Sequence, residues 1–308
     1  MAAQRDPIRD WREQFARRVL NVDFEPLSDG PFRASIKPIF ERIMRTAHSP
    51  GTTFRDEALV KDGDDRFSLL ISQSRNLDVA HHRRELRLGR GDATLMHLCE
   101  IGSVGSCDDV GFIAVMVPNS ELTARCAGLG SAVMQRLPRR SEALQLLRAY
   151  IVGLEKGRFD PSGEARDTIC RHVIDLVVLA ATPHRPIGES STSAVVAARL
   201  AAALDHITSC FQDPELSLAT VAGSLRISPR YLQRLLETSG TSFTARVNEL
   251  RLQRAFTLLT DGACRISDVA LQVGFSDISH FNQLFRSRFG DTPRGVRGRG
   301  RRANSHEV

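Results

Sequence analysis

Residues 216–297 carry the same pattern of apolar residues twice, and each copy predicts a helix, a tight turn and a second helix. The first helix and the cap that follows it are repeated at an offset of 48 residues, where Leu218, Val221, Ala222 and Ser228 recur as Ile266, Val269, Ala270 and Ser276. The stripe of the second helix is repeated at an offset of 49 residues, where Leu232, Leu235 and Leu236 recur as Phe281, Leu284 and Phe285. An apolar triplet at positions i, i+3 and i+4 indicates a helix with one buried face. Each copy is therefore a helix-turn-helix candidate.

The polar residues of each predicted second helix fall on the face opposite the apolar stripe. Ser228 is expected to cap the first of these helices, with Pro229 in its first turn. The face that a DNA groove would meet carries Arg230, Gln233, Arg234 and Glu237 in the first copy and Ser279, Asn282, Gln283 and Arg286 in the second. Arg, Gln and Asn form paired hydrogen bonds with base edges. A single polar face is as often merely solvated, but two copies in register on a basic segment predict that these residues, apart from Glu237, bind DNA.

The positive charge of the chain is concentrated in the same segment. Residues 199–308 contain 15 Arg and 10 acidic residues, whereas residues 1–198 contain 27 basic and 26 acidic residues. The C-terminal segment therefore holds +5 of the net charge of +6. Binding to the phosphate backbone of DNA requires a basic surface of this kind.

The residues of both copies also resemble the AraC/XylS family of bacterial transcription regulators. The resemblance covers about 80 residues and rests on Ser228-Pro229-Arg230-Tyr231-Leu232-Gln233-Arg234, Gly240, Ser242-Phe243, Arg251, Ala255, Leu258-Leu259, Ile266, Val269-Ala270, Gly274-Phe275, Asp277, Ser279, Phe281, Phe285, Gly290 and Pro293. It implies two helix-turn-helix units joined by a long helix over residues 243–259, which enter successive major grooves on one face of the DNA. It also implies control of a promoter in concert with RNA polymerase, by activation more often than by repression.

Arg226 departs from this resemblance at the turn of the first unit. The family often has glycine there, and the second copy retains Gly274 at the corresponding position. If the turn needs a left-handed residue, Arg226 adds modest strain and reorients the first unit slightly.

The region before the repeat predicts short strands. From about residue 32 to residue 117 the sequence alternates, with the clearest strands at 66–72, 76–82, 85–88 and 93–98 and a turn at 89–92. Many short strands at hairpin spacing indicate a β-sandwich or barrel. The Gly91-Asp92 turn and the opening Pro26-Leu27-x3-Phe32-Arg33-Ala34 resemble the cupin-like sensory domain of the same family, over about residues 20–180. The predicted fold class is α+β: an N-terminal cupin-like β-barrel with flanking helices, followed by an all-α double helix-turn-helix domain.

Two amphipathic helices are expected after the strands, at residues 141–155 and 164–181. They either cover the barrel or pair with a second subunit, so a homodimer is one of two open arrangements. The segment that follows is rich in Pro, Ser and Thr and indicates a linker. The predicted organisation is a sensory and dimerisation domain at 1–181, a linker at 182–193, a DNA-binding domain at 194–298 and a basic, disordered tail at 299–308.

A metal-dependent enzyme joined to a DNA-binding domain is the main alternative, because cupin barrels often hold a metal. The candidate ligands are His81, His82, Glu85 and His97. Neighbouring residues of a strand point to opposite faces, so His81 and His82 cannot both bind one ion inside the barrel. The sequence has no His-x-His pair, nucleophile elbow, Walker loop or dinucleotide fingerprint. We therefore predict no metal, no other cofactor and no catalysis.

The spacing of the cysteines and the length of the apolar runs indicate the cellular compartment of the protein. The chain has six cysteines, Cys99, Cys107, Cys126, Cys170, Cys210 and Cys264. None of them forms a CxxC pair, which favours buried, reduced thiols over disulfides or a redox sensor. The charged N-terminal stretch and the lack of a run of about 18 apolar residues predict neither a signal peptide nor a membrane span. A cytoplasmic protein is expected.

These features together predict a sequence-specific, promoter-binding transcription regulator, an activator controlled through its N-terminal domain. The sequence does not identify the effector, nor whether it is a small molecule. A DNA-binding protein without ligand control is the third alternative, and it leaves the N-terminal domain without a role.

Overall fold

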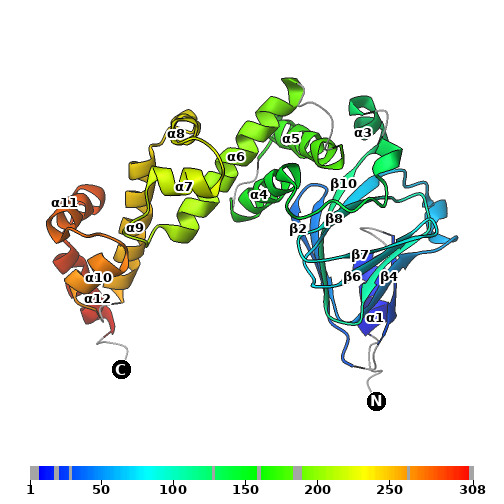
Figure 1. The fold of residues 1–308 in the computed structure, drawn as a ribbon. Coiled ribbons are helices and arrows are strands. Elements are labelled where there is room, and N and C mark those ends of the chain that lie inside the picture. Colours follow the sequence, from blue (N-terminus) through cyan, green and yellow to red (C-terminus); the bar gives the residue numbers. More distant parts are fainter. Residues whose placement is uncertain are drawn as a thin grey trace, which may run out of the picture. The chain divides into compact units, whose positions relative to one another are not determined.

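The computed structural model describes residues 7–16, 21–27, 30–126, 129–157, 161–182, 189–261 and 264–304 (Figure 1). The chain divides into two compact units, residues 1–198 and 199–308. Each unit has its own apolar core. None of the helices in the described ranges combines the length and the apolar content needed to cross a bilayer.

The N-terminal unit is built on two antiparallel sheets of five strands. One sheet has the order β1-β4-β9-β6-β7 and the other β2-β3-β10-β5-β8. The strands are β1 Asp23–Pro26, β2 Ala34–Phe40, β3 Ile43–His48, β4 Gly51–Arg55, β5 Phe67–Ser72, β6 Leu77–His81, β7 Arg84–Leu88, β8 Ala93–His97, β9 Gly102–Ser106 and β10 Val110–Val117. The α+β class with a β-rich, cupin-like first part is confirmed, although the strands form two separate sheets and not one closed barrel.

Alternation along the strands explains why the two sheets pack face to face. In β6, Leu77 and Val79 are buried while Asp78 between them is exposed. These two side chains meet Leu70 and Phe112 of the other sheet in one apolar cluster. Each large apolar side chain removed from water in this way contributes roughly 1.5 to 3 kcal/mol to folding.

Helical segments flank the sheets. They are α1 Pro7–Trp11, the π-helix η1 Arg12–Ala16, the 3-10 helices η2 Leu59–Asp62 and η3 Leu129–Ala132, α3 Asn119–Arg125, α4 Glu142–Lys156 and α5 Glu164–Ala181. Helices α4 and α5 are the two helices predicted from the sequence. They pack against each other with their apolar stripes buried, so these stripes are used within the chain.

The predicted turn at residues 89–92 is held by a buried carboxylate. Asp92 accepts hydrogen bonds from Arg136 Nη2 (2.5 Å) and from the backbone N–H groups of Arg139 (2.9 Å) and Gly89 (3.2 Å). Burial alone would raise the pKa of Asp92, but these hydrogen bonds lower it below its ordinary value. The carboxylate thereby ties the turn to the segment that leads into α4.

The C-terminal unit is all helical. Its helices are α6 Glu189–Cys210, which includes the boundary between the units, and then α7 Leu218–Ser224, α8 Pro229–Thr238, α9 Phe243–Thr260, α10 Ile266–Gln272, α11 Ile278–Phe289 and α12 Pro293–Asn304. The duplicated apolar residues form two cores, one around Leu232 and Leu236 and one around Phe281 and Phe285. Helix α9 is the predicted connector, and it contributes Val247 to the first core and Leu252, with Ala255 and Leu259, to the second.

Two predicted boundaries differ from the structure. Residues 189–193 of the expected linker begin α6, because the alanine-rich stretch after them continues the helix; residues 183–188 lie outside the described residues. Residues 299–304 of the expected disordered tail continue α12, which starts at Pro293, a residue suited to a first helical position. Arg299 pairs with Asp291 across the start of this helix (2.5 Å). Residues 305–308 lie outside the described residues.

One predicted helix cap is also wrong. Ser228 caps α8 as expected, its Oγ accepting from the Tyr231 N–H (3.2 Å). The cap of α11, however, is Asp277 and not Ser276, because the Asp277 carboxylate accepts from the N–H groups of both Ser279 (2.7 Å) and His280 (3.2 Å). A carboxylate at this position also interacts favourably with the helix dipole, and a cap of either kind contributes about 1 kcal/mol.

Candidate functional site

Helix α8 presents a polar face because its three leucines are buried. Arg230, Gln233 and Arg234 are all exposed. The Arg234 guanidinium lies 5.2 Å from the centre of the Tyr231 ring, and Arg199 approaches the same ring at 5.4 Å. Gln233 Nε2 donates to Glu237 Oε1 (2.9 Å), so the amide must exchange this partner before it can pair with a base. The cation–π contact with the tyrosine restricts the orientations that the exposed Arg234 side chain can adopt.

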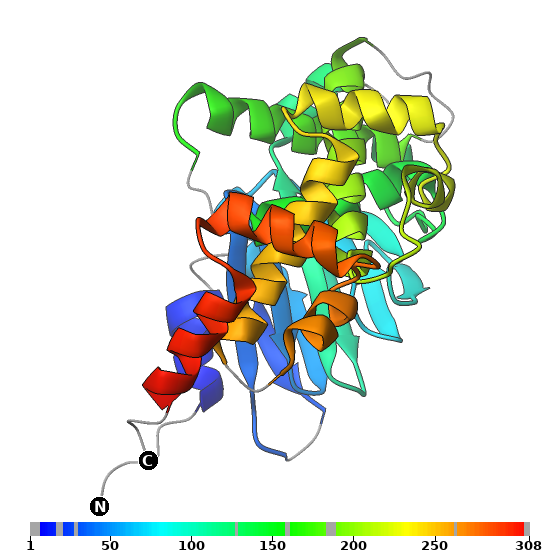
Figure 2. The same ribbon diagram turned by 90° about the vertical axis from the view of Figure 1, so that its left-hand side faces the viewer.

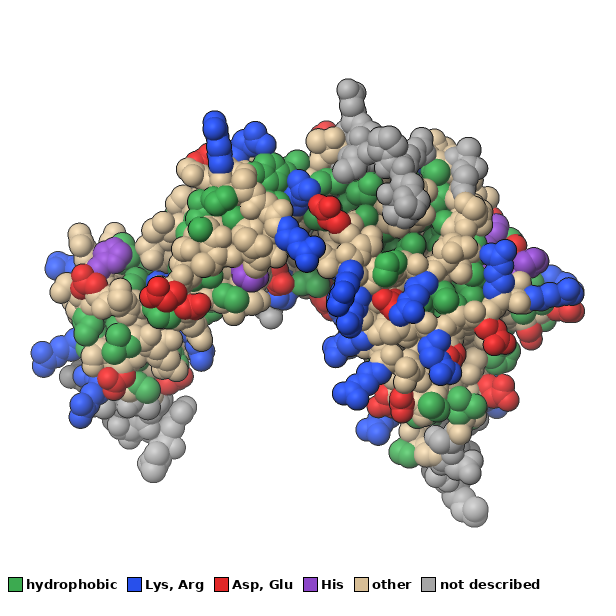
Figure 3. Space-filling model, viewed as in Figure 1, with side chains coloured by type: hydrophobic (Ala, Val, Ile, Leu, Met, Phe, Trp, Pro, Cys, Tyr) green, Lys and Arg blue, Asp and Glu red, His purple; other side chains and the backbone are tan. Residues whose placement is uncertain are grey.

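Helix α11 presents the corresponding face. Ser279, Asn282, Gln283 and Arg286 are exposed. Asn282, Gln283 and Arg286 also line one groove together with Arg294 of α12. In the sequence Arg294 belongs to a basic stretch at the end of the chain, whereas the fold brings it beside the predicted base-reading residues. Figure 3 shows basic side chains standing out over α8 and near α12.

An ion pair fixes α11 to the connecting helix. Two of the three guanidinium nitrogens of Arg288 donate to the Glu249 carboxylate of α9, Nε at 2.8 Å and Nη2 at 2.9 Å. The hydrogen bonds from Arg288 lower the pKa of Glu249, which stays ionised at neutral pH. In Figure 2, the orange-yellow α9 runs down from below α8 and passes behind α11. No sequence pattern predicted this pair, because 39 residues separate its members.

A buried arginine joins α9 to the end of α6. Arg251 Nε donates to the Phe211 carbonyl (2.7 Å) and Nη2 to the Asp213 carbonyl (2.8 Å). Its guanidinium lies 5.7 Å from the centre of the Phe275 ring, beside the turn of the second unit. Burial lowers the pKa of Arg251 relative to that of a free arginine, but the group remains charged.

The turns of the two units both use a left-handed residue, which confirms the condition set for Arg226, while the reorientation of the first unit stays a prediction. Arg226 has φ +55° and Gly274 has φ +99°. The non-glycine residue is disfavoured by the clash of its Cβ with the backbone.

Arg226→Gly should therefore stabilise the protein by about 1 kcal/mol, reduced by the greater freedom of glycine in the unfolded chain. Urea unfolding of the intact chain would measure this, with the exposed helical Arg254→Gly, expected to cost about 1 kcal/mol, as the opposite control. A fall in stability for Arg226→Gly would contradict the strain at this turn.

The four residues considered as metal ligands are placed differently from one another. His81 is buried at the end of β6 and its Nε2 accepts from the His97 N–H (3.3 Å), whereas His82 is exposed in the turn that follows. The two imidazoles nevertheless approach the same Glu100 Oε2, at 3.3 Å and 3.5 Å. Glu85 is exposed on β7. Burial lowers the pKa of His81, which keeps its ring neutral.

Ligand atoms of His97, Cys99 and Glu100 do lie within 4.8 Å of one another. This trio offers atom types that zinc accepts, and Cys99 and Glu100 were not among the predicted ligands because the prediction was centred on the histidines. His97 ends β8, and Cys99 and Glu100 lie in the turn that follows, so their closeness follows from local sequence.

All six cysteines are free. Cys126 is buried, but Cys99, Cys107 and Cys264 are exposed, so the expectation of buried thiols is wrong for these three. Each of them lies in a connection between regular elements, where the backbone runs over the surface.

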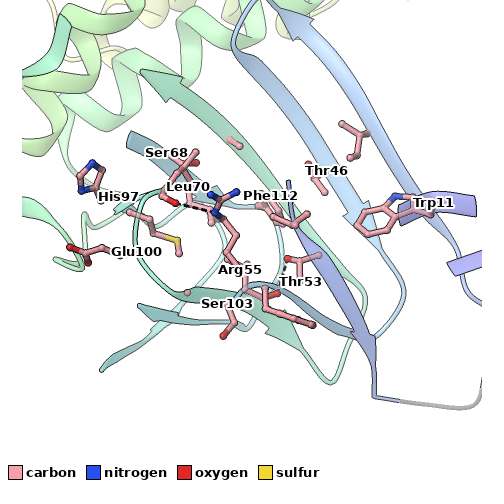
Figure 4. A pocket seen from close by; sticks show the side chains of 18 residues that line it. Trp11, Thr46, Thr53, Arg55, Ser68, Leu70, His97, Glu100, Ser103 and Phe112 are labelled. Atoms are coloured by element: carbon pink, nitrogen blue, oxygen red, sulfur yellow. Dashed lines mark hydrogen bonds between the residues drawn. The ribbon is translucent and has the colours of Figure 1, made fainter. Parts of the chain in front are cut away.

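A cavity of about 60 Å³ lies between the two sheets of the N-terminal unit (Figure 4). Its wall is largely apolar and includes Leu70, Phe112 and Ala114 from one sheet and Val104 from the other. Trp11 of α1 also lines it. The sequence did not predict it, because it depends on how the two sheets and α1 pack.

Two helix-turn-helix units on a basic segment, each exposing a polar second helix, define a DNA-binding protein. Residues 221–299 match the family described as a helix-turn-helix domain. The chain is 28% identical over 256 residues to the transcriptional activator RhrA of Rhizobium meliloti, covering 82% of this chain and 80% of that protein. It is 29% identical over 155 residues to the HTH-type transcriptional activator RhaS of Escherichia coli, covering 50% of this chain and 54% of that protein. The crystal structure of the AraC-like transcriptional activator CuxR aligns with 86% of this chain and 94% of its own, at 22% identity and a TM-score of 0.47.

The sequence matches confirm the resemblance to the AraC/XylS family in the C-terminal unit. The chain is a DNA-binding transcription regulator that carries a DNA-binding domain of this type.

Proposed function

We propose that this chain activates transcription by placing α8 and α11 in successive major grooves of a promoter, and that a small molecule held by the N-terminal unit controls it. The observation that carries the first part is the pair of exposed polar faces, Arg230, Gln233 and Arg234 on α8 and Ser279, Asn282, Gln283 and Arg286 on α11. Helices α8 and α11 each pack into an apolar core, and α9 contributes residues to both cores. The two polar faces are therefore held at a fixed separation.

Activation is supported by the relatives, RhrA and RhaS, which are both named activators. An activator acts together with RNA polymerase, which is the second partner that we propose. The names of these relatives also favour a regulator over an enzyme fused to a DNA-binding domain. The cavity between the sheets supports control by a small molecule, because apolar pockets with few polar groups are the usual form of ligand sites. A homodimer would use surfaces other than the buried residues of α4 and α5, which pack within this chain.

The two reading helices should recognise different bases. Arg234→Ala is expected to relax preference in one half of the site and Gln283→Ala in the other, each costing about 1 to 3 kcal/mol where the side chain makes a paired contact. The halves should lie about one helical turn, roughly 34 Å, apart. Selection of preferred sites from a random DNA library by wild type and both variants measures this directly.

Arg254→Ala, which removes an exposed basic side chain of α9 that lines neither the groove beside α11 nor that along α8, serves as the matched control and should leave every base preference unchanged. If both test variants blur the same base pairs, or neither changes any preference, one unit only clamps the backbone and the paired-reader proposal fails.

A further inference from the structure

The cavity in the N-terminal unit contains two buried polar groups without partners. The exposed fraction of Trp11 is 6% and that of Thr46 is 2%. Trp11 Nε1 and Thr46 Oγ1 have no hydrogen-bond partner in the part of the chain that the structure describes. More than nine in ten buried polar groups in folded proteins are paired, so two such groups on the wall of one cavity need an explanation.

These two groups lie at the same end of the cavity. Thr46 on β3 pairs with Ile36 on β2, and Ile36 packs in one cluster with Trp11. Figure 4 shows the indole of Trp11 and the side chain of Thr46 in this region, away from Arg55 and Glu100. The indole N–H can only donate, whereas the hydroxyl can donate or accept. One acceptor oxygen within hydrogen-bond distance of both atoms would satisfy them.

The charges of the wall exclude an anionic ligand. Arg55 is the arginine of the wall, and its nitrogens already donate to the carbonyls of Leu98, Asn21 and Leu59 and to the Asp62 carboxylate. Glu100 adds a carboxylate to the wall, which repels a second negative charge. Apart from Arg55, which is already paired, and the imidazole of His97, the described residues of the wall offer no group that would neutralise a buried anion, which would be costly to bring out of water.

We propose that this cavity binds a small, uncharged and mostly apolar molecule whose single acceptor oxygen takes the hydrogen bonds of Trp11 Nε1 and Thr46 Oγ1. This inference rests on the control by a small molecule proposed above and names its chemical class. The cavity volume of about 60 Å³ is several times the roughly 10 to 15 Å³ that one water needs, which corresponds to about four to six non-hydrogen atoms. A short ketone, aldehyde or ether has these properties. A ligand of this size binds with a Kd no tighter than about micromolar.

Trp11 is the only tryptophan of the chain, so its indole reports on this cavity alone. The experiment uses the intact chain labelled with ¹⁵N and follows the single indole N–H signal by NMR while butanone, n-pentane or butyrate is added. Butanone should shift the signal downfield in a saturable manner. n-Pentane, which has no acceptor, and butyrate, which is charged at neutral pH, should not produce this downfield shift.

Thr46→Val removes the hydroxyl with little change of shape and should weaken butanone binding about 2- to 10-fold, as expected for one hydrogen bond. Thr52→Val, a half-buried residue of β4 outside the cavity wall, is the matched control and should leave the affinity unchanged. Trp11→Phe removes the N–H itself, and saturation-transfer signals from butanone should fall by a similar factor. Equal affinities in wild type and Thr46→Val, a shift that grows without saturating, or equal binding of butyrate would overturn the proposal.

The two proposals fail separately. The indole signal is read without DNA, so its failure would overturn the ligand class and leave site recognition by α8 and α11 intact. A loss of all sequence preference in the library selection would overturn the proposed site recognition by α8 and α11. The butanone titration would not be affected by that result.

Discussion

Gly274→Ala is expected to destabilise the second helix-turn-helix unit by about 2 to 5 kcal/mol and to abolish sequence-specific DNA binding. The residue has φ +99°, where a Cβ costs about 1 to 2 kcal/mol. The added Cβ would also lie 2.7 Å from the Gln212 carbonyl oxygen and 2.9 Å from Arg251 Nε, and relieving such contacts costs about 1 to 3 kcal/mol more. Because whole domains are stable by only about 5 to 15 kcal/mol, this loss is large.

Urea unfolding followed by circular dichroism, together with gel shifts on a selected site, would measure both effects. Gly223→Ala is the matched control, since the glycine lies inside α7 with open space where an added Cβ would point, and the variant should gain up to about 1 kcal/mol from helix propensity. An unchanged unfolding midpoint for Gly274→Ala would show that the turn tolerates a side chain and would refute the steric explanation.

Arg55→Met is expected to have a comparable effect on the N-terminal unit, a loss of about 3 kcal/mol. The side chain is 5% exposed and holds three carbonyls and the carboxylate of Asp62, whose side chain is 26% exposed. Removing the guanidinium takes the hydrogen-bond donor away from these three carbonyls and the positive charge away from the Asp62 carboxylate. Breaking a buried ion pair typically costs about 3 to 5 kcal/mol. Arg45→Met, which breaks a more exposed pair with Glu155, should cost no more than about 1 kcal/mol.

The same pair gives a pH signature. Burial alone would raise the pKa of Asp62, but hydrogen bonds led by that from Arg55 lower it to about 2 from 3.8. The folded protein therefore binds this proton more weakly than the unfolded chain. The stabilisation is complete above about pH 4 and is lost as the pH falls from there through about 2. Urea midpoints between pH 5 and pH 2 should fall more steeply for wild type than for Arg55→Met, and parallel profiles would contradict the assignment.

The sequence could predict most of the C-terminal unit, because local periodicity determines it. The stripes around Leu232 and Phe281 follow from helix spacing, whereas the connector α9 was expected from the resemblance to the AraC/XylS family. The cap of α11 did not follow, since Ser276 and Asp277 are both good caps and only the geometry of the turn selects the second. The helical start of α6 and the extension of α12 were not predicted either, because a polar or basic composition does not by itself exclude a helix that continues from a neighbouring stretch.

The β-rich fold class of the N-terminal unit could be predicted from the sequence, but its cavity could not. Alternating strands indicate inward and outward faces, yet the pairing of ten strands into two sheets is a matter of long-range contacts. Trp11 and Thr46 are 35 positions apart, and no spacing rule brings an indole from an N-terminal helix to an inner strand of a sheet. The Arg55 network likewise joins residues from four separate segments.

Helix α9 contributes side chains to both C-terminal cores, so neither core can move without the other. A target sequence can therefore exchange individual base pairs and lose only the contacts at those positions. Inserting about five base pairs between its halves would instead turn one half to the opposite side of the duplex, since a helical turn takes about 10 to 10.5 base pairs. Under the paired-reader proposal, the distance between the halves of the operator is thus set by the length of one helix of the protein, and only the base identities within each half can vary.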